Sequence, residues 1–174
     1  MNKQRRLWMR IVILLILFLA VGFALYQNSF ANKETTVQLN KQAPNFKLAT
    51  LSDEKIELKD LQGKGVLVNF WASWCDPCKK EMPAIQKAYN QYKDKGFEVV
   101  AVNIQEPDLT VESFLKNNNI TFPVILDKSG EVYNLWDVGR IPVSFFISSD
   151  GIIKRKYEGE MSQEQLDQWI KETL

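Results

Sequence analysis

Residues 66–72, VLVNFWA, form a continuous apolar run that constrains the fold more than any other part of this 174-residue chain. A short run rich in β-branched and aromatic residues is typical of a central strand that is buried on both faces. Residues 75–94 follow with apolar side chains at helical spacing, and 97–104 (FEVVAVNI) predict a second buried strand. A strand, a helix and a strand of these lengths predict a right-handed βαβ unit on a parallel sheet, and therefore an α/β fold.

Shorter patterns on either side of this unit predict the remaining elements. Alternation in KIEL and the turn at Ser52-Asp53 predict an N-terminal hairpin, and Asp150-Gly151 predicts a second one. Ser162 with Gln165 three residues later forms a capping box that opens a last helix through Leu174. The second hairpin consists of strands over 143–148 and 152–159. Between the two hairpins we expect a short helix from Thr110 through Asn119, a strand over 122–127 and a helix over 130–138.

The N-terminal segment has the pattern of a membrane signal-anchor. Residues 11–26 (IVILLILFLAVGFALY) carry no charge, and four basic residues but no acidic one precede them. Positive charge stays on the cytoplasmic side of a membrane, so the rest of the chain should lie outside the cytoplasm. We expect a basic tail over 1–10, a transmembrane anchor over 11–30, a linker over 31–42 and a domain over 43–174. The alternative is a signal peptide that is cleaved after Ala31, since the run is also close to a signal-peptide core in length.

Two compositional facts exclude several function classes. The chain has no histidine, which rules out Ser-His-Asp and Cys-His catalysis and every histidine-ligated metal site. Beyond residue 31 the chain holds 18 basic and 21 acidic residues, so it lacks the basic character that nucleic-acid binding needs. We therefore expect no nucleic-acid partner.

Both cysteines lie in WASWCDPC, directly after the predicted strand and at the start of the predicted helix. Amide groups and the dipole at a helix start favour a thiolate, so Cys75 is the predicted nucleophile and Cys78 the resolving thiol. Pro77 suits the first helical turn, where its missing N–H is not needed. Asp76 adds a negative charge beside the sulfurs, so we expect a less acidic Cys75 than in strongly oxidising proteins.

Other readings of the cysteine pair fit less well. A structural disulfide that closes so small a loop gains little stability, and a zinc site would need two ligands that the chain does not offer. We therefore predict no metal and no cofactor beyond a redox-active Cys75–Cys78 disulfide.

Several nearby residues could serve this chemistry. Glu81 lies one helical turn after Cys78, where a carboxylate could carry its proton, although a solvated charge is a common alternative. Glu106 follows the second strand and is by itself more typical of a loop charge. Pro142 immediately precedes an apolar strand, a position that suits a residue without an N–H, and Trp74 is typical of a surface that receives a partner.

At these residues the chain resembles the thioredoxin superfamily. WASWCDPC corresponds to its W-x-x-W-C-x-P-C block, and Arg140-Ile141-Pro142 corresponds to its loop with a cis-proline that faces the disulfide. The lead-in APNFKL, the segment CDPCKKEMP and a helix and strand inserted at about 106–127 are similar to the ResA-type (TlpA-like) membrane-anchored thioredoxins. This resemblance covers residues 37–174 and implies a thioredoxin fold with an extra N-terminal hairpin, a central helix-strand insertion and one preceding transmembrane helix.

The resemblance also implies a function. ResA-type proteins reduce the disulfide of apocytochrome c before haem attachment, and a CcdA-type membrane protein re-reduces them. Their active-site glutamates match Glu81 and Glu106. The predicted catalytic residues are Cys75, Cys78, Glu81 and Pro142. The predicted substrate-binding residues are Trp74, Asp76, Pro77, Glu106 and Ile141.

Two departures narrow the assignment further. Ordinary thioredoxins carry an acidic residue where this chain has Asn69, and the P-x-x-x-T-x-x-C pattern of peroxiredoxins fails at Val68 and Ala72. We therefore expect a disulfide reductase of the cell membrane whose domain faces the extracytoplasmic side. Reduction of other exported or spore-envelope proteins and a non-catalytic binding module are the alternatives.

Overall fold

The computed structural model describes residues 3–31 and 37–174, which belong to two compact units, residues 1–35 and 36–174. The first unit contains helix α1 (Lys3–Ala31). Among the described residues, no helix is both long enough and apolar enough to cross a membrane, so the expected span over 11–30 is not confirmed. Residues 32–36 of the expected linker lie outside the described part of the chain.

The second unit is built on a five-stranded mixed sheet with the strand order β5-β4-β3-β6-β7. Strands β3 (Gly65–Trp71), β4 (Phe97–Ile104) and β5 (Val124–Asp127) are parallel, whereas β6 (Val143–Ile147) and β7 (Ile153–Glu158) form an antiparallel hairpin beside β3. Every residue of β3 is buried, as its apolar sequence predicts for a central strand. The expected βαβ unit on a parallel sheet is confirmed.

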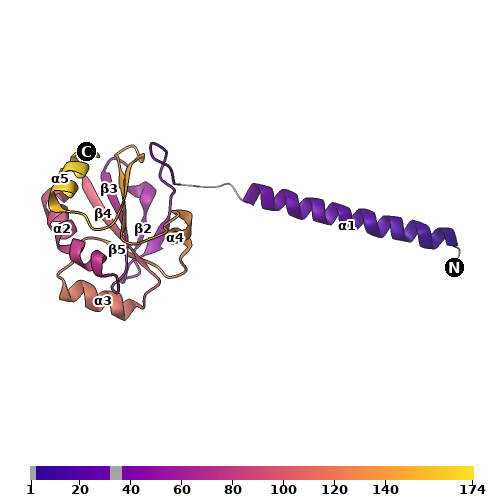
Figure 1. The fold of residues 1–174 in the computed structure, drawn as a ribbon, viewed down its shortest axis with the longest axis horizontal. Helices are drawn as coiled ribbons and strands as arrows, with labels where there is room; N and C mark the ends of the chain where they lie inside the picture. The colour runs from indigo at the N-terminus through magenta and orange to yellow at the C-terminus, as the bar shows by residue number, and fades with distance from the viewer. Residues whose placement is uncertain (1–2, 32–36) are drawn as a thin grey trace. The chain divides into compact units, whose positions relative to one another are not determined.

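Helices cover both faces of this sheet (Figure 1). One face packs against α2 (Asp76–Tyr92), α3 (Asp108–Asn117) and α5 (Gln163–Lys171), and the other against α4 (Glu131–Leu135) and the residues around a small hairpin of β1 (Lys47–Ala49) and β2 (Lys55–Glu57). Successive residues of a strand point to opposite faces, so Leu67 and Trp71 join the α2 core while Val68 and Phe70 join the α4 core. By the same alternation Asn69 faces α2.

Most predicted elements are confirmed, with shifts at their ends. The hairpin of β1 and β2, the helix and strand inside 106–127, and the Ser162–Gln165 capping box are all present. Thr110 does not cap α3, because the helix begins at Asp108 after the extended residue Pro107, whose carbonyl accepts the N–H groups of Thr110 and Val111. The last helix ends at Lys171 rather than at Leu174.

The last part of the expected linker pairs with the domain. The N–H of Asn40 donates to the carbonyl of Ile153 at 2.8 Å, and the N–H of Ile153 donates to the carbonyl of Lys41 at 2.9 Å. Gln42 forms an isolated antiparallel bridge with Ile152. These contacts fix the chain to the start of β7 before β1 begins.

Candidate active site

Cys75 and Cys78 form a disulfide at the start of α2, with an S–S distance of 2.07 Å and a Cα–Cα distance of 5.3 Å. Cys75 is the N-cap of α2, and its Sγ accepts the backbone N–H of Cys78 at 3.2 Å. Pro77 lies in the first turn, where its missing N–H leaves no bond unmade. Cys75 is 6% exposed and Cys78 is completely buried, so only Cys75 offers any surface to a partner.

The helix start explains how a reduced Cys75 would react. The first N–H groups of a helix have no partner within it, and they carry the positive end of the dipole. The N–H of Cys78 already points at Sγ of Cys75, so a thiolate formed there would find a donor in place. The arrangement suits a thiol that attacks a disulfide of another molecule.

Glu81 lies in the interior behind the disulfide rather than in solvent, with only 1% of its surface exposed. Its carboxylate accepts hydrogen bonds from Nδ2 of Asn69 at 2.9 Å and from the backbone N–H of Met161 at 3.3 Å. Burial raises the pKa of Glu81 from 4.5 to about 7, although these two bonds favour the charged form and lower it. A carboxyl that exchanges its proton near neutral pH can act as an acid and as a base.

Glu106 joins the end of β4 to the loop that leads into the active site. It accepts the backbone N–H of Ser73 at 2.7 Å, the hydroxyl of Ser73 at 2.5 Å and Nδ2 of Asn103 at 2.7 Å. Ser73 lies two residues before Cys75. Glu106 is therefore bound to the segment that positions the nucleophile and is more than a solvated loop charge.

The peptide bond between Ile141 and Pro142 is cis, as the resemblance implied. Val143, the next residue, pairs with Phe70, so Pro142 lies beyond that pair at the end of β3 from which the chain runs to Cys75. Ile141 is half-buried and packs against the cores on both faces of the sheet.

The two residues on either side of Cys75 are an exposed tryptophan, Trp74, and an aspartate that pairs with a lysine, Asp76. Trp74, which precedes Cys75, is 68% exposed, an exposure that suits contact with a partner. Asp76 faces solvent and pairs with Nζ of Lys79 at 2.5 Å, and this contact lowers the pKa of Asp76 below its usual range. The negative charge that we expected beside the sulfurs is thus partly neutralised by Lys79.

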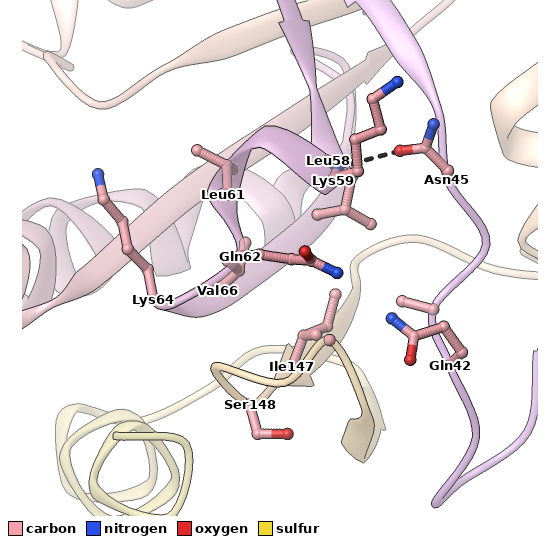
Figure 2. A pocket seen from close by; sticks show the side chains of 12 residues that line it. Gln42, Asn45, Leu58, Lys59, Leu61, Gln62, Lys64, Val66, Ile147 and Ser148 are labelled. Atoms are coloured by element: carbon pink, nitrogen blue, oxygen red, sulfur yellow. Dashed lines mark hydrogen bonds between the residues drawn. The ribbon is translucent and has the colours of Figure 1, made fainter.

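A pocket with a volume of about 130 Å³ lies near the start of β3, at the opposite end of this strand from the disulfide. Figure 2 shows the side chains that line it. The pocket is lined by Leu58, Val66 and Ile147 among others, and Val66 and Ile147 pair where β3 begins, far along the strand from Cys75. None of the predicted site residues lines this pocket. Cys75 keeps 6% of its surface exposed beside the exposed Trp74, an arrangement that suits a protein substrate.

The sequence did not identify several polar residues that the fold brings to the site. Asn69 and Ser144 lie in apolar strands and bond to each other behind the disulfide, at 2.9 Å between Nδ2 and Oγ. Ser73 and Asn103 bind Glu106. A polar residue in an otherwise buried strand was the available signal, because a buried polar group needs a partner.

Comparisons with known proteins agree with this geometry. The family model described as the AhpC/TSA family matches residues 39–156. The chain is 46% identical to the thiol-disulfide oxidoreductase ResA of Bacillus cereus (strain ATCC 10987 / NRS 248) and 41% identical to that of Geobacillus kaustophilus (strain HTA426). The alignments cover 97% and 98% of this chain, respectively, and 97% of each relative.

Solved structures share the fold. StoA from Bacillus subtilis is 34% identical with a TM-score of 0.65, over 75% of this chain and 98% of that one. A thiol:disulfide interchange protein of the thioredoxin family from Chlorobium tepidum TLS is 26% identical with a TM-score of 0.72, over 78% of this chain and 97% of that one. With two cysteines joined at a helix start and relatives of this kind, the chain belongs to the thioredoxin-like AhpC/TSA family and, within it, to the thiol-disulfide oxidoreductases.

Proposed function

We propose that this oxidoreductase works as a reductase of protein disulfides outside the cytoplasm, and that its substrate is apocytochrome c before haem attachment. The observation that carries the proposal is the difference in exposure between the two cysteines: Cys75 is 6% exposed at the helix start, whereas Cys78 has no exposed surface. The similarity to proteins named ResA supports the substrate, since the resemblance to that family implies apocytochrome c.

In the proposed reaction the reduced Cys75 thiolate attacks one sulfur of the substrate disulfide. A mixed disulfide forms, and the other substrate sulfur leaves as a thiolate that takes up a proton. Cys78 then loses its proton and attacks Sγ of Cys75, which releases the second substrate thiol and leaves the Cys75–Cys78 disulfide. Two electrons pass to the substrate, and a dithiol of a CcdA-type membrane protein restores them.

Glu81 is the proposed acceptor of the Cys78 proton. It lies three residues after Cys78 on α2, so both side chains point to the same side of the helix. It is buried, and burial brings its pKa to about 7, so it can accept a proton and return it at neutral pH. The chain offers no histidine for this task.

The location outside the cytoplasm is proposed from the N-terminal sequence. The basic residues before the uncharged run 11–26 favour retention of the N-terminus on the cytoplasmic side. Protease treatment of intact protoplasts tests this, because an extracytoplasmic domain is digested while cytoplasmic proteins are spared. Fractionation of the same cells separates a membrane anchor from a cleaved export signal.

Trapping of substrates on a Cys78→Ala variant tests the reductase proposal. This variant keeps the attacking thiol and should accumulate mixed disulfides through Cys75. The matched Cys75→Ala variant retains only the buried sulfur and should trap far less. Apocytochrome c in the trapped fraction would support the proposed substrate. A trapped fraction that holds only other exported proteins would favour a reductase of exported or spore-envelope proteins. Equal, negligible trapping by both variants would contradict a reductase and favour a binding module.

A further inference from the structure

A buried polar cluster lies on the α2 side of the sheet behind the disulfide. It consists of Asn69 on β3, Ser144 on β6, Glu81 on α2 and the backbone N–H of Met161 before α5; we call it the Asn69 cluster. Asn69 has no exposed surface, and Glu81 and Ser144 are each 1% exposed. Asn69 and Ser144 pair directly across β3 and β6, so the sheet itself fixes their separation.

The orientation of the Asn69 amide is the informative feature. Its Nδ2 donates to Oε1 of Glu81 at 2.9 Å and to Oγ of Ser144 at 2.9 Å, which uses both N–H groups. Its Oδ1 is buried and has no hydrogen-bond partner. The reverse orientation would place the amide oxygen against the carboxylate. In the observed orientation Oδ1 of Asn69 stays unpaired, while one N–H group of its amide points at Glu81.

We propose that Asn69, which is also bonded to Ser144, is a positioning residue that stabilises the ionised form of Glu81 and so makes this carboxyl a reversible proton carrier. The inference rests on the proposed function, because the proton in question is that of the resolving thiol Cys78. Ser144 accepts the second N–H of the amide. An ionised carboxylate can only accept, so a charged Glu81 favours the orientation that turns the N–H group and not the oxygen toward it.

The charges around Glu81 favour this role for an uncharged donor. Glu160, in the segment between β7 and α5, carries a negative charge that raises the pKa of Glu81 further. Strands β3 and β6 contain no charged residue, and the side chains that they present to the cluster, Asn69 and Ser144, are both uncharged. On α2 the preceding turn presents Cys78, which is bound in the disulfide. With no cation among the causes of its pKa, Glu81 depends on the N–H groups of Asn69 and Met161 for its ionised form.

Carbon-detected NMR of the oxidised full-length chain tests the proposal. The chain has no histidine and its cysteines are joined, so neither residue type titrates near neutral pH. A carboxyl carbon whose signal shifts in this pH range can therefore be recognised. We expect the Asn69→Leu variant to raise the titration midpoint of Glu81 by about one to two pKa units, the range of a hydrogen bond to a charged group. Asn103→Leu is the matched control, since Asn103 is equally buried but donates to Glu106, and it should leave that midpoint in place.

A measurement on the unmodified chain keeps the proposal testable if Asn69→Leu does not fold. The side-chain N–H signals of Asn69 should shift with pH at the same midpoint as the carboxyl carbon of Glu81. An unchanged midpoint in Asn69→Leu, or Asn69 signals that do not respond to pH, would overturn the proposal. Trapping of substrate on Cys75 does not require Glu81 to titrate, so loss of trapping would count against the proposed function and not against this inference.

Discussion

The buried carboxyl of Glu81 should make the stability of the oxidised protein fall as the pH rises from about 5 to about 8. Glu81 is 1% exposed, and burial raises its pKa from 4.5 to about 7 in the folded chain. A carboxyl with a raised folded-state pKa binds its proton more tightly in the folded state than in the unfolded one. The contribution of Glu81 to the free energy of unfolding is complete below the ordinary pKa of 4.5 and is lost as the pH rises through the folded-state pKa of about 7.

The size of this effect follows from the pKa difference. One pKa unit corresponds to about 1.4 kcal/mol, so the full change in the free energy of unfolding is roughly 3 kcal/mol between pH 4.5 and a pH well above 7. Other carboxyls do not obscure this window. Interactions lower the pKa values of Glu57, Asp76, Asp150 and Glu172, so those groups change stability below pH 4.5 and with the opposite sign.

Urea denaturation at pH 5, 6, 7 and 8 measures the effect, with the unmodified chain compared with Glu81→Gln. The Gln side chain has a similar shape and does not titrate, but it has a single acceptor oxygen and loses one of the two bonds from Asn69 and Met161. The slopes with pH rather than the absolute stabilities are therefore compared. We expect a steep fall in the unmodified chain and a flat profile in the variant. Parallel profiles for the two proteins would refute the assignment of a raised pKa to Glu81.

Three further predictions test the fold and the loop before the nucleophile. Trp136→Ala should lower the free energy of unfolding by about 3–5 kcal/mol, because Trp136 is completely buried against Phe145; a loss below about 1 kcal/mol in urea denaturation would contradict this packing. Ser162→Ala should cost about 1 kcal/mol in the same assay through loss of the α5 capping box, and no change would show that the cap does not contribute. Glu106→Leu should speed hydrogen exchange of the Ser73 amide at least about tenfold, since it removes a bond to a charged acceptor, and unchanged exchange would contradict that bond.

The sequence predicts those parts of the fold that depend on local patterns. β3 and β4 follow from apolar runs, α5 from its capping box, and the hairpin of β6 and β7 from Asp150-Gly151. The predicted start of α3 was wrong. Both Thr110 and Pro107 suit the position before a helix, and the local sequence pattern does not decide between them. Helix ends depend on such close competition, and tertiary contacts decide it.

Apart from Pro142 and Glu106, which the resemblance indicated, the candidate site was predictable only where its residues are contiguous. Cys75, Cys78, Pro77 and Glu81 share one stretch of sequence, so their spacing on a helix start could be derived directly. The partners of Glu81 could not, because the pairing of Asn69 with Ser144 depends on the register of β3 and β6. Nor does sequence show that Asn69 faces α2.

The same limit applies to Glu106. By itself it is an ordinary loop residue, and only the parallel pairing of β3 and β4 brings it to Ser73. The resemblance to known proteins indicated that Glu106 is functional, but the physical reason appears only in the fold. A charged side chain that accepts three hydrogen bonds from two strand ends fixes the loop that carries the nucleophile.

The central claim is that electrons enter and leave the protein through the Cys75–Cys78 pair in its folded state. Equilibration of the full-length chain in a graded series of dithiothreitol redox buffers, followed by thiol alkylation and mass measurement, tests this directly. We predict a single reversible two-electron transition between the disulfide and two free thiols, with an unchanged circular dichroism spectrum. A disulfide that persists in every buffer, or that yields only after the chain unfolds, would contradict it.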